Sequence, residues 1–240
     1  MATTLSPGER FINAYNVLDY SLRTQYNFKT SISFTDLIKN CSALNQVIRS
    51  YEDDLIDFAR LRNVIVHNHT GELIAQPNEE VVAVLEKIAR LISTPPLAID
   101  AIKSVKVDTV QSTVALSELI VKTSEVGHNN IPVYKNGVLV GIIRWRTFIE
   151  FLGKIISKGQ SIDDFVKRTT AEQFLLENPG TVHFSIASAK ITTEEVLQTF
   201  NKNRKTSAIV ITSDGSSSGK LLGIITSSDI LDLMKVLEGY

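Results

Sequence analysis

The sequence is poor in cysteine, in long apolar runs and in excess charge of either sign. Its one cysteine in 240 residues, Cys41, allows no internal disulfide, and no Cys/His set has the spacing of a zinc site. No apolar run reaches the roughly 18 residues needed to span a bilayer, and the first residues lack the features of a targeting signal. These absences exclude a disulfide scaffold, a structural metal site and a membrane partner, and we expect a cytoplasmic protein.

Charge is nearly balanced, with 25 Lys and Arg against 26 Asp and Glu and a net charge of -1. Such a balance gives no bulk attraction to nucleic acid, and we expect no DNA partner. A content of 43% hydrophobic and 21% charged residues is that of an ordinary globular chain rather than a disordered or fibrous one. Indications of function must therefore come from local motifs.

Proline marks the main division of the chain. The run Ser93-Thr94-Pro95-Pro96 follows a helical pattern and cannot continue it, because proline lacks the amide donor and restricts the residue before it. A length of 240 residues also favours two domains over one. We therefore predict a multidomain protein, with one domain over residues 1–94 and another over residues 95–240.

The first domain is predicted to be an all-α helical bundle. Apolar residues recur at helical spacing in four stretches, and Ser33 and Asn78 have the residue types and positions of helix N-caps. Within residues 1–95, nine basic and eleven acidic residues give a net of -2, so the bundle is not a basic module. The four apolar faces consist of Phe11, Ile12, Tyr15, Leu18 and Leu22; of Phe34, Leu37, Ile38, Leu44, Val47 and Ile48; of Tyr51, Leu55, Phe58, Leu61 and Ile65; and of Val81, Val82, Leu85, Ile88 and Leu91.

The second domain contains an internal repeat. Residues 131–152 and 209–234 each show the pattern of a strand, an Asn-Gly or Asp-Gly turn, a strand ending in Gly-Ile-Ile and an amphipathic helix. Val133 aligns with Ile211 at an offset of 78 and Gly141 with Gly223 at an offset of 82, so the second copy has four extra residues in its turn. A strand and a helix are expected before each copy, the strands at 105–107 and 182–184 and the helices at 113–126 and 193–203.

Two such strand-helix-strand-strand-helix units in succession resemble a pair of CBS domains, the regulatory modules first named from cystathionine beta-synthase. The resemblance implies an α/β fold with one unit over about residues 97–158 and the other over about residues 174–240. It also implies a cleft that binds an adenine nucleotide or a related adenosyl ligand (AMP, ADP or ATP) as a regulatory ligand, with no cofactor required.

The second unit carries the pattern that contacts nucleotides in that family, Thr226-Ser227-Ser228-Asp229. The resemblance implies that Thr226 contacts phosphate and Asp229 contacts ribose. Free amides at a helix N-terminus suit an anion and a carboxylate suits vicinal hydroxyls, although the same residues also suit a simple helix cap. The other expected contacts are the backbone of Ser207, Ala208 and Ile209 for adenine and the cations Arg204, Lys205 and Arg144 for phosphate.

The first unit departs from this pattern, because Arg144 aligns with Thr226 and Thr147 aligns with Asp229. The first unit therefore lacks the carboxylate that would bind ribose. We predict a single nucleotide site in the second unit, which Arg144 reaches from across the cleft.

The third helical stretch ends in Leu61-Arg62-Asn63-Val64-Ile65-Val66-His67, which resembles the HEPN superfamily (higher eukaryotes and prokaryotes nucleotide-binding). In ribonuclease members of that family, the Arg and His of two protomers meet at a dimer interface and cleave RNA without metal. The resemblance implies catalysis by Arg62 and His67, and Asn63 shares the helical face of His67. An imidazole can move the 2′-hydroxyl proton, and a guanidinium can stabilise the developing phosphorane charge.

Two interpretations of this motif stay open. Cations near a helix C-terminus also satisfy its carbonyls and dipole, and the acidic residues 52–54 of the same helix disfavour RNA. The first hypothesis is a nucleotide-sensing CBS protein whose helical homodimer is a metal-independent endoribonuclease. The alternative is a non-catalytic regulatory or scaffold protein that binds nucleotide and acts on a partner. A metabolic enzyme has no support, because no nucleophile motif, phosphate loop or metal set is present.

Overall fold

The structure is a computed structural model that describes residues 5–66, 76–102, 107–124, 129–179 and 183–240. The chain divides into two compact units, an N-terminal unit of Met1–Pro96 with Val236–Tyr240 and a C-terminal unit of Leu97–Lys235. The predicted second domain, residues 95–240, differs from the C-terminal unit because the last five residues pack with the N-terminal helices. Leu237 contacts the helical core, and the Tyr240 hydroxyl donates to the Thr94 carbonyl at 2.6 Å.

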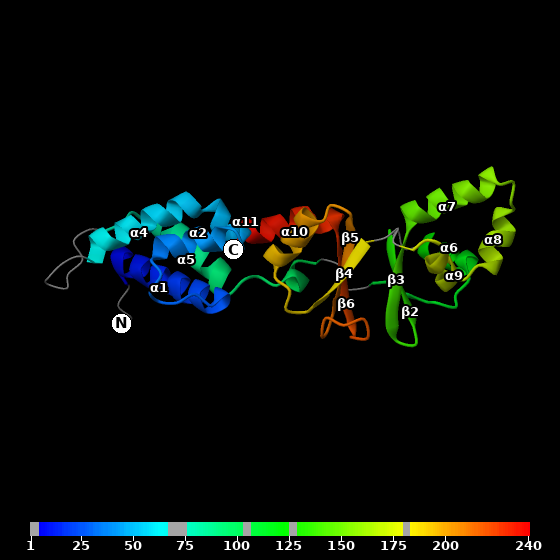
Figure 1. Cartoon of the computed structure of the whole chain (residues 1–240), viewed down its shortest axis with the longest axis horizontal. Helices are drawn as coiled ribbons and strands as arrows, with labels where there is room; N and C mark the ends of the chain where they lie inside the picture. The colour runs from blue at the N-terminus through cyan, green and yellow to red at the C-terminus, as the bar shows by residue number, and fades with distance from the viewer. Residues whose placement is uncertain (1–4, 67–75, 103–106, 125–128, 180–182) are drawn as a thin grey trace. The chain divides into compact units, whose positions relative to one another are not determined.

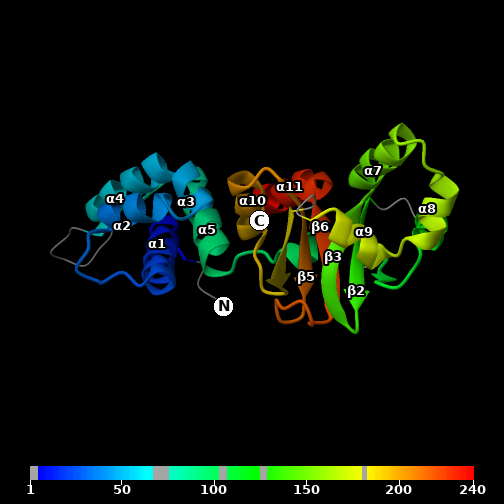
Figure 2. The same cartoon turned by 45° about the vertical axis from the view of Figure 1, so that its right-hand side comes forward.

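The N-terminal unit is helical, as the apolar periodicity predicts. Ser6 forms a capping box with Glu9, and the Asn78 side chain accepts from the Val81 amide at 2.8 Å, so the chain marks these helix starts locally. Helices α1 and α5 lie side by side (Figure 2). The elements are α1 (Pro7–Tyr26), α2 (Phe34–Ser42), α3 (Gln46–Ser50), α4 (Glu52–Val66) and α5 (Glu79–Ser93).

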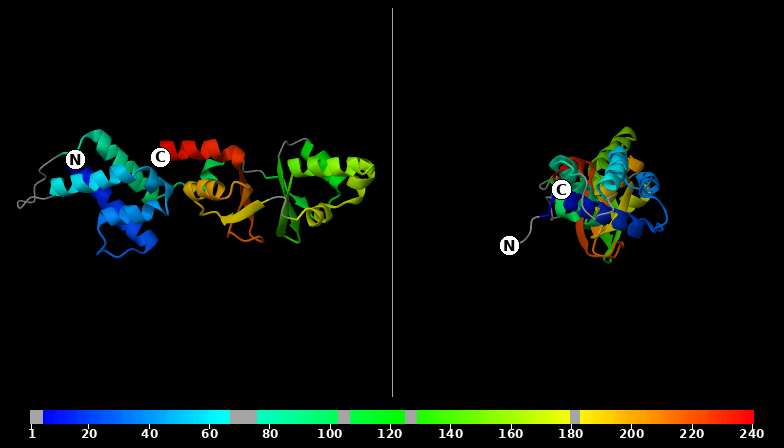
Figure 3. Two further views of the ribbon diagram at one scale, coloured as in Figure 1. Left: turned by 45° about the horizontal axis from the view of Figure 1, so that its top comes forward. Right: turned by 90° about the vertical axis from the view of Figure 1, so that its left-hand side faces the viewer.

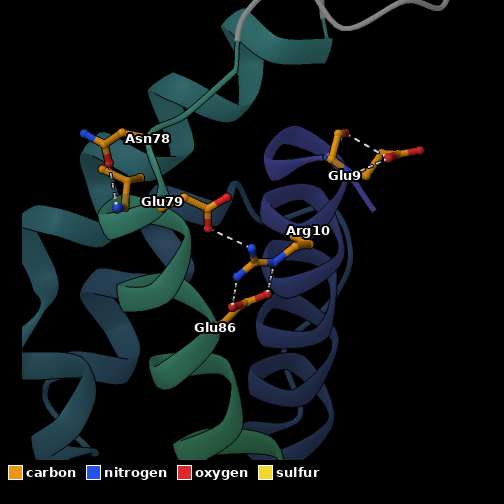
Figure 4. A network of polar contacts seen from close by, with 7 residues as sticks. Glu9, Arg10, Asn78, Glu79 and Glu86 are labelled. Carbon is orange, nitrogen blue, oxygen red and sulfur yellow. Dashed lines mark hydrogen bonds and ion pairs between the residues drawn. The ribbon is translucent and has the colours of Figure 1, made fainter. Parts of the chain in front are cut away.

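An ion-pair network joins α1 to α5 (Figure 4). The Arg10 guanidinium donates to Glu86 through Nε at 2.9 Å and through Nη2 at 2.7 Å, and its Nη1 donates to Glu79 at 2.8 Å. This bidentate geometry fixes the relative position of the two helices more closely than a single contact would.

The second predicted apolar stretch is two helices rather than one. Asn45 interrupts it, because its side-chain Oδ1 accepts from the Ile48 amide at 3.1 Å and so begins α3 anew. Leu44, expected on the apolar face, lies in the break and is 53% exposed. The other predicted core residues are buried or partly buried in a single cluster.

The C-terminal unit contains two three-stranded sheets with the same topology. In each, the first strand pairs parallel to the second, and the second pairs antiparallel to the third. We call β1, α6, β2, β3 and α7 the first repeat, and β4, α10, β5, β6 and α11 the second repeat. Their bounds are β1 (Val110–Gln111), α6 (Leu116–Ser124), β2 (Asn130–Lys135), β3 (Val138–Arg144), α7 (Trp145–Ser157), β4 (His183–Ser188), α10 (Thr193–Lys202), β5 (Thr206–Thr212), β6 (Leu221–Thr226) and α11 (Ile230–Gly239).

Strand register confirms the alignment of the two copies. Val133 pairs with Gly141 in the first sheet, and Ile211 pairs with Gly223 in the second. The four extra residues therefore lie in the β5–β6 hairpin, outside the paired strands. The β2–β3 turn has positive φ at Asn136 (50°) and Gly137 (80°), as the Asn-Gly dipeptide predicts for a two-residue hairpin.

The strand expected at 105–107 lies largely outside the described residues. Residues 105 and 106 lie outside the described part of the chain, Val107 is not in a strand, and β1 begins at Val110. β1 has only two residues and is therefore too short to show an alternating apolar pattern, so it could not be predicted from the sequence. The helices expected at 113–126 and 193–203 are α6 and α10, and the strand expected at 182–184 begins β4.

Each sheet is covered by a segment from outside its own repeat, which the predicted unit limits of 97–158 and 174–240 did not include. The 3-10 helix η1 (Ala98–Ala101) precedes the first repeat but packs in the core of the second, and the Ala98 amide donates to the Ile191 carbonyl. Helix α9 (Ala171–Glu177) precedes the second repeat but packs in the core of the first, and the Ala171 amide donates to the Val114 carbonyl. Helix α8 (Ile162–Arg168) also joins the first core.

The two sheets face each other inside the C-terminal unit (Figures 1 and 3). Leu139 and Ile142 of the first sheet and Ala208 and Val210 of the second form one buried cluster between them. The long β5–β6 hairpin adds a contact, since the Leu139 amide donates to the Ser217 carbonyl at 2.8 Å. This packing brings the end of β3 close to the start of β5.

Candidate functional site

The hydroxyl and the carboxylate of the Thr226–Asp229 pattern are in contact. β6 ends at Thr226, and the short helix η2 (Ser227–Asp229) leads into α11. Asp229 Oδ2 accepts from the Thr226 amide at 2.7 Å and from the Thr226 hydroxyl at 3.0 Å. The carboxylate is therefore held by one oxygen, so Oδ1 can accept from a ligand without disturbing the cap.

A second hydroxyl, which the motif analysis did not assign, adjoins this pair. Ser228 Oγ lies 2.6 Å from Thr226 Oγ1. Ser228 is exposed and Thr226 is partly exposed, so both hydroxyls can meet a solvent-borne ligand. The Thr-Ser-Ser-Asp run could have identified Ser228 from the sequence, because consecutive hydroxyl residues at a helix start suit an oxyanion.

Ala208 lies beside Thr226, because the two residues pair across β5 and β6. Ser207, Ala208 and Ile209, the residues predicted to offer backbone to adenine, are at most 8% exposed. In the first repeat the position of Ala208 is taken by Asn130, which pairs with Arg144. Among the described residues, the buried Oδ1 of Asn130 has no hydrogen-bond partner.

The three predicted phosphate-contacting cations lie around the start of β5. Arg144, at the end of β3, donates from Nη1 to Ser207 Oγ at 3.3 Å and so links the first repeat to the second. Arg204 and Lys205 directly precede β5 and are exposed. Within the described ranges, none of the three forms an ion pair. Their charges are therefore available to an anionic ligand.

Two hollows of about 520 Å³ and 420 Å³ lie between β4 and α10, and both are lined by Thr199 and Lys202. Neither is lined by Thr226 or Asp229. We place the candidate site at the β6–α11 junction, because the Thr226 hydroxyl and the Asp229 carboxylate of the predicted pattern meet there at the end of a strand.

The residues of the HEPN-like motif are only partly described. Arg62 lies with Cζ 5.8 Å from the centre of the Tyr15 ring on α1, and its buried Nε has no hydrogen-bond partner among the described residues. Burial raises the pKa of Tyr15 to about 12, and the Arg62 charge opposes this shift. Asn63 is exposed, and His67 lies outside the described residues. The resemblance to HEPN proteins stays a prediction.

The segment from β4 into α11 matches the family model of the CBS domain over residues 183–236. This segment is a CBS domain. It contains Ser207, Ala208, Ile209, Thr226 and Asp229, so the predicted backbone and ribose contacts all lie inside the matched region. Arg144 lies outside it, in the first repeat.

Several solved structures are similar to the chain. One is a putative signal-transduction protein with CBS domains from Burkholderia ambifaria (19% identity, 58% of this chain, 94% of that chain, TM-score 0.43). Another is the CBS domain of a membrane protein from Sphaerobacter thermophilus (21% identity, 57% and 87% coverage, TM-score 0.41). A third is the CBS domain of a bacterial CNNM/CorC family Mg²⁺ transporter in complex with ATP (15% identity, 66% and 98% coverage, TM-score 0.45). No curated protein matches the sequence significantly.

Two kinds of feature are absent from the parts of the chain that the structure describes. No group of three or more His, Cys, Asp and Glu side chains is arranged to hold a metal ion. No helix in the same ranges is long and apolar enough to cross a membrane.

Proposed function

We propose that the chain is a regulatory protein that binds an adenine nucleotide at the β6–α11 junction of its CBS domain. The observation that carries this proposal is the contact between Thr226 and Asp229, which fixes one carboxylate oxygen and leaves the other for a ligand. The adenine nucleotide class comes from the resemblance of the sequence to CBS domain pairs. The match of residues 183–236 to the CBS domain supports that resemblance.

Each part of the nucleotide has a partner of suitable chemistry in this arrangement. The ribose hydroxyls donate to Asp229 Oδ1, because a carboxylate is the stronger acceptor for two neighbouring hydroxyls. The first phosphate meets the hydroxyls of Thr226 and Ser228 and the amides at the start of η2. The adenine edge pairs with strand backbone near Ser207 and Ala208, as the resemblance to CBS domain pairs implies.

Regulation then depends on a difference in affinity. A ligand shifts an equilibrium between two arrangements only if it binds one of them more tightly. A helical homodimer with two arrangements would supply such an equilibrium, with a partner protein or the dimer itself as the regulated species.

Isothermal titration with AMP, ADP and ATP tests the proposal on the full chain. We expect Asp229→Asn to weaken binding by about 10-fold or more, because a hydrogen bond to a charged group contributes about 1.5–3 kcal/mol. Asparagine keeps a side-chain oxygen that can accept from the Thr226 amide and hydroxyl, so we expect folding to be retained. Asp163→Asn is the control, because Asp163 is an exposed carboxylate on α8 that pairs with Lys167. Equal affinity in Asp229→Asn and wild type would overturn the assignment.

A second candidate function, RNA cleavage by a helical dimer, is favoured by one feature of the N-terminal unit. The Arg62 Nε is buried and has no hydrogen-bond partner among the described residues. Arg62 as a whole is only partly buried, and a guanidinium is suited to bind phosphate oxygens.

Cleavage of single-stranded RNA by the purified chain tests this candidate. We expect His67→Ala to abolish cleavage. Arg60→Ala is expected to retain it, because Arg60 is an exposed residue of the same helix that pairs with Asp57. Absence of cleavage by the wild type, or cleavage that survives His67→Ala, would leave the N-terminal unit with a non-catalytic role.

A further inference from the structure

Arg144 lies at the strand position of the first repeat that is equivalent to a predicted phosphate-contacting position of the second repeat. It ends β3, and in the sheet register it takes the place that Thr226 takes in the second repeat, since Arg144 pairs with Asn130 as Thr226 pairs with Ala208. The first repeat thus has no hydroxyl at its own phosphate position. The Arg144 guanidinium instead donates to the hydroxyl of Ser207 in the second repeat.

Three cations lie around the start of β5. Arg144, Arg204 and Lys205 contribute three positive charges, and no described carboxylate forms an ion pair with any of them. The nearby carboxylate that the proposed site uses, Asp229, already accepts two hydrogen bonds from Thr226. A ligand in contact with these cations gains affinity with each negative charge it carries.

From this charge and the contact of Arg144 with Ser207 we infer that the ligand is an adenosine di- or triphosphate, and that Arg144 is the residue that selects it. This inference rests on the proposed nucleotide site. The first phosphate is held at Thr226, and the phosphates beyond it reach the guanidinium, whose planar donor set fits phosphate oxygens. A cationic adenosyl ligand such as a sulfonium is disfavoured by the same three charges.

Ser207 explains why Arg144 rather than Arg204 or Lys205 makes the selection. Arg204 and Lys205 are exposed, so water screens their attraction for phosphate. Arg144 is half-buried, and its bond to the 8% exposed Ser207 holds the guanidinium in one place. An ordered, partly desolvated cation discriminates between ligands more strongly than a mobile one.

Titration of the full chain with adenosine, AMP, ADP, ATP and S-adenosylmethionine tests the inference. We expect ADP and ATP to bind at least about 10-fold more tightly than AMP, with adenosine and S-adenosylmethionine weakest. Arg144→Gln should remove most of the preference for ADP and ATP over AMP and leave adenosine affinity within about threefold of the wild type. It should also flatten the dependence of ADP affinity on salt concentration, because one phosphate contact is lost.

Arg146→Gln is the matched control, because Arg146 is two residues away, is exposed and pairs with Glu150 on α7. It should keep the ligand preference of the wild type. An affinity for S-adenosylmethionine or AMP equal to that for ADP would overturn the inference and leave the nucleotide site standing. An equal loss for every ligand in Arg144→Gln would also overturn it, since Arg144 would then be structural. If none of the five ligands binds the wild type, the proposed function itself fails.

Discussion

Gly141 and Gly223 occupy equivalent strand positions. At each of them a segment from elsewhere in the chain packs closely on the strand and leaves little room for a side chain. A Cβ at Gly141 would lie 2.7 Å from Leu175 Cδ1 of α9, and one at Gly223 would lie 3.2 Å from the Cδ1 atoms of Ile99 and Ile102. The repeated Gly-Ile-Ile made these glycines easy to align from sequence. The reason for glycine at these two positions could not be predicted, because the segments that pack on them are short and distant along the chain.

Gly141→Val should therefore destabilise the C-terminal unit. The added side chain must displace Leu175, and overpacking of this kind costs about 1–3 kcal/mol. Chemical denaturation followed by circular dichroism measures the loss. Gly153→Ala on α7 is the opposite case, because a Cβ there meets no atom within 4 Å. Removing a glycine from a helix interior should raise stability by about 0.5–1 kcal/mol. Unchanged stability in Gly141→Val would mean that α9 does not cover this strand.

Asn45 sets the break between α2 and α3, and its substitution is a second residue-scale prediction. Its side chain accepts from the Ile48 amide and donates to the Tyr26 hydroxyl at 3.1 Å, and the residue is 5% exposed. Asn45→Ala should cost about 1–2 kcal/mol, because an N-cap bond is lost at a buried position. Asn40→Ala, at an exposed position of α2, is the comparison and should change the denaturation midpoint little. Equal effects of the two changes would contradict a capping role.

At the scale of elements, the amphipathic helices could be predicted from the sequence, whereas the packing of η1 and α9 on the other repeat could not. Amphipathic helices such as α1 and α5 carry their own periodicity and caps, so a local pattern suffices. The sequence shows no comparable pattern for η1 and α9, which each pack on the other repeat, because each is only a few residues long. The polar cluster of Thr226 and Asp229 was found for the opposite reason, since both residues lie within one helical turn.

The junction of α1 and α5 makes a prediction about pH. The Arg10 guanidinium holds the pKa of Glu86 below its usual range. A lowered folded-state pKa means that the pair stabilises the protein above the unfolded-state pKa of glutamate. This contribution is lost as the pH falls through the lower folded-state value. Glu86→Gln should therefore lower the thermal midpoint slightly at neutral pH, and the difference from wild type should close in acid.

Thermal scans at several pH values follow this difference. Glu80→Gln is a suitable control, since Glu80 is an exposed residue of the same helix. It should not reproduce the pH dependence. A difference between Glu86→Gln and wild type that is as large in acid as at neutral pH would mean that packing, not the charge pair, is responsible.

At the scale of the whole molecule, two units with separate cores predict two unfolding events. The helical core draws on residues up to Ile92 and on Leu237, whereas the other clusters lie within residues 98–233. The division after a proline pair was visible in the sequence because it is a local signal. The transfer of the last five residues to the helical unit was not, since α11 has an uninterrupted apolar pattern across the division.

Calorimetry with ADP then connects the candidate site to the fold. All the proposed contacts lie in the C-terminal unit, so ADP at 100 times its dissociation constant should stabilise that unit by about 2.7 kcal/mol. The transition of the N-terminal unit should move less, because its core contains no proposed ligand contact. Asp229→Asn, with its affinity about 10-fold weaker, should reduce this stabilisation to about 1.4 kcal/mol or less at the same ADP concentration, while Asp163→Asn should keep it. An equal shift of both transitions, or a shift that is undiminished in Asp229→Asn, would place the ligand elsewhere, because stabilisation by mass action reports only the unit that holds the site.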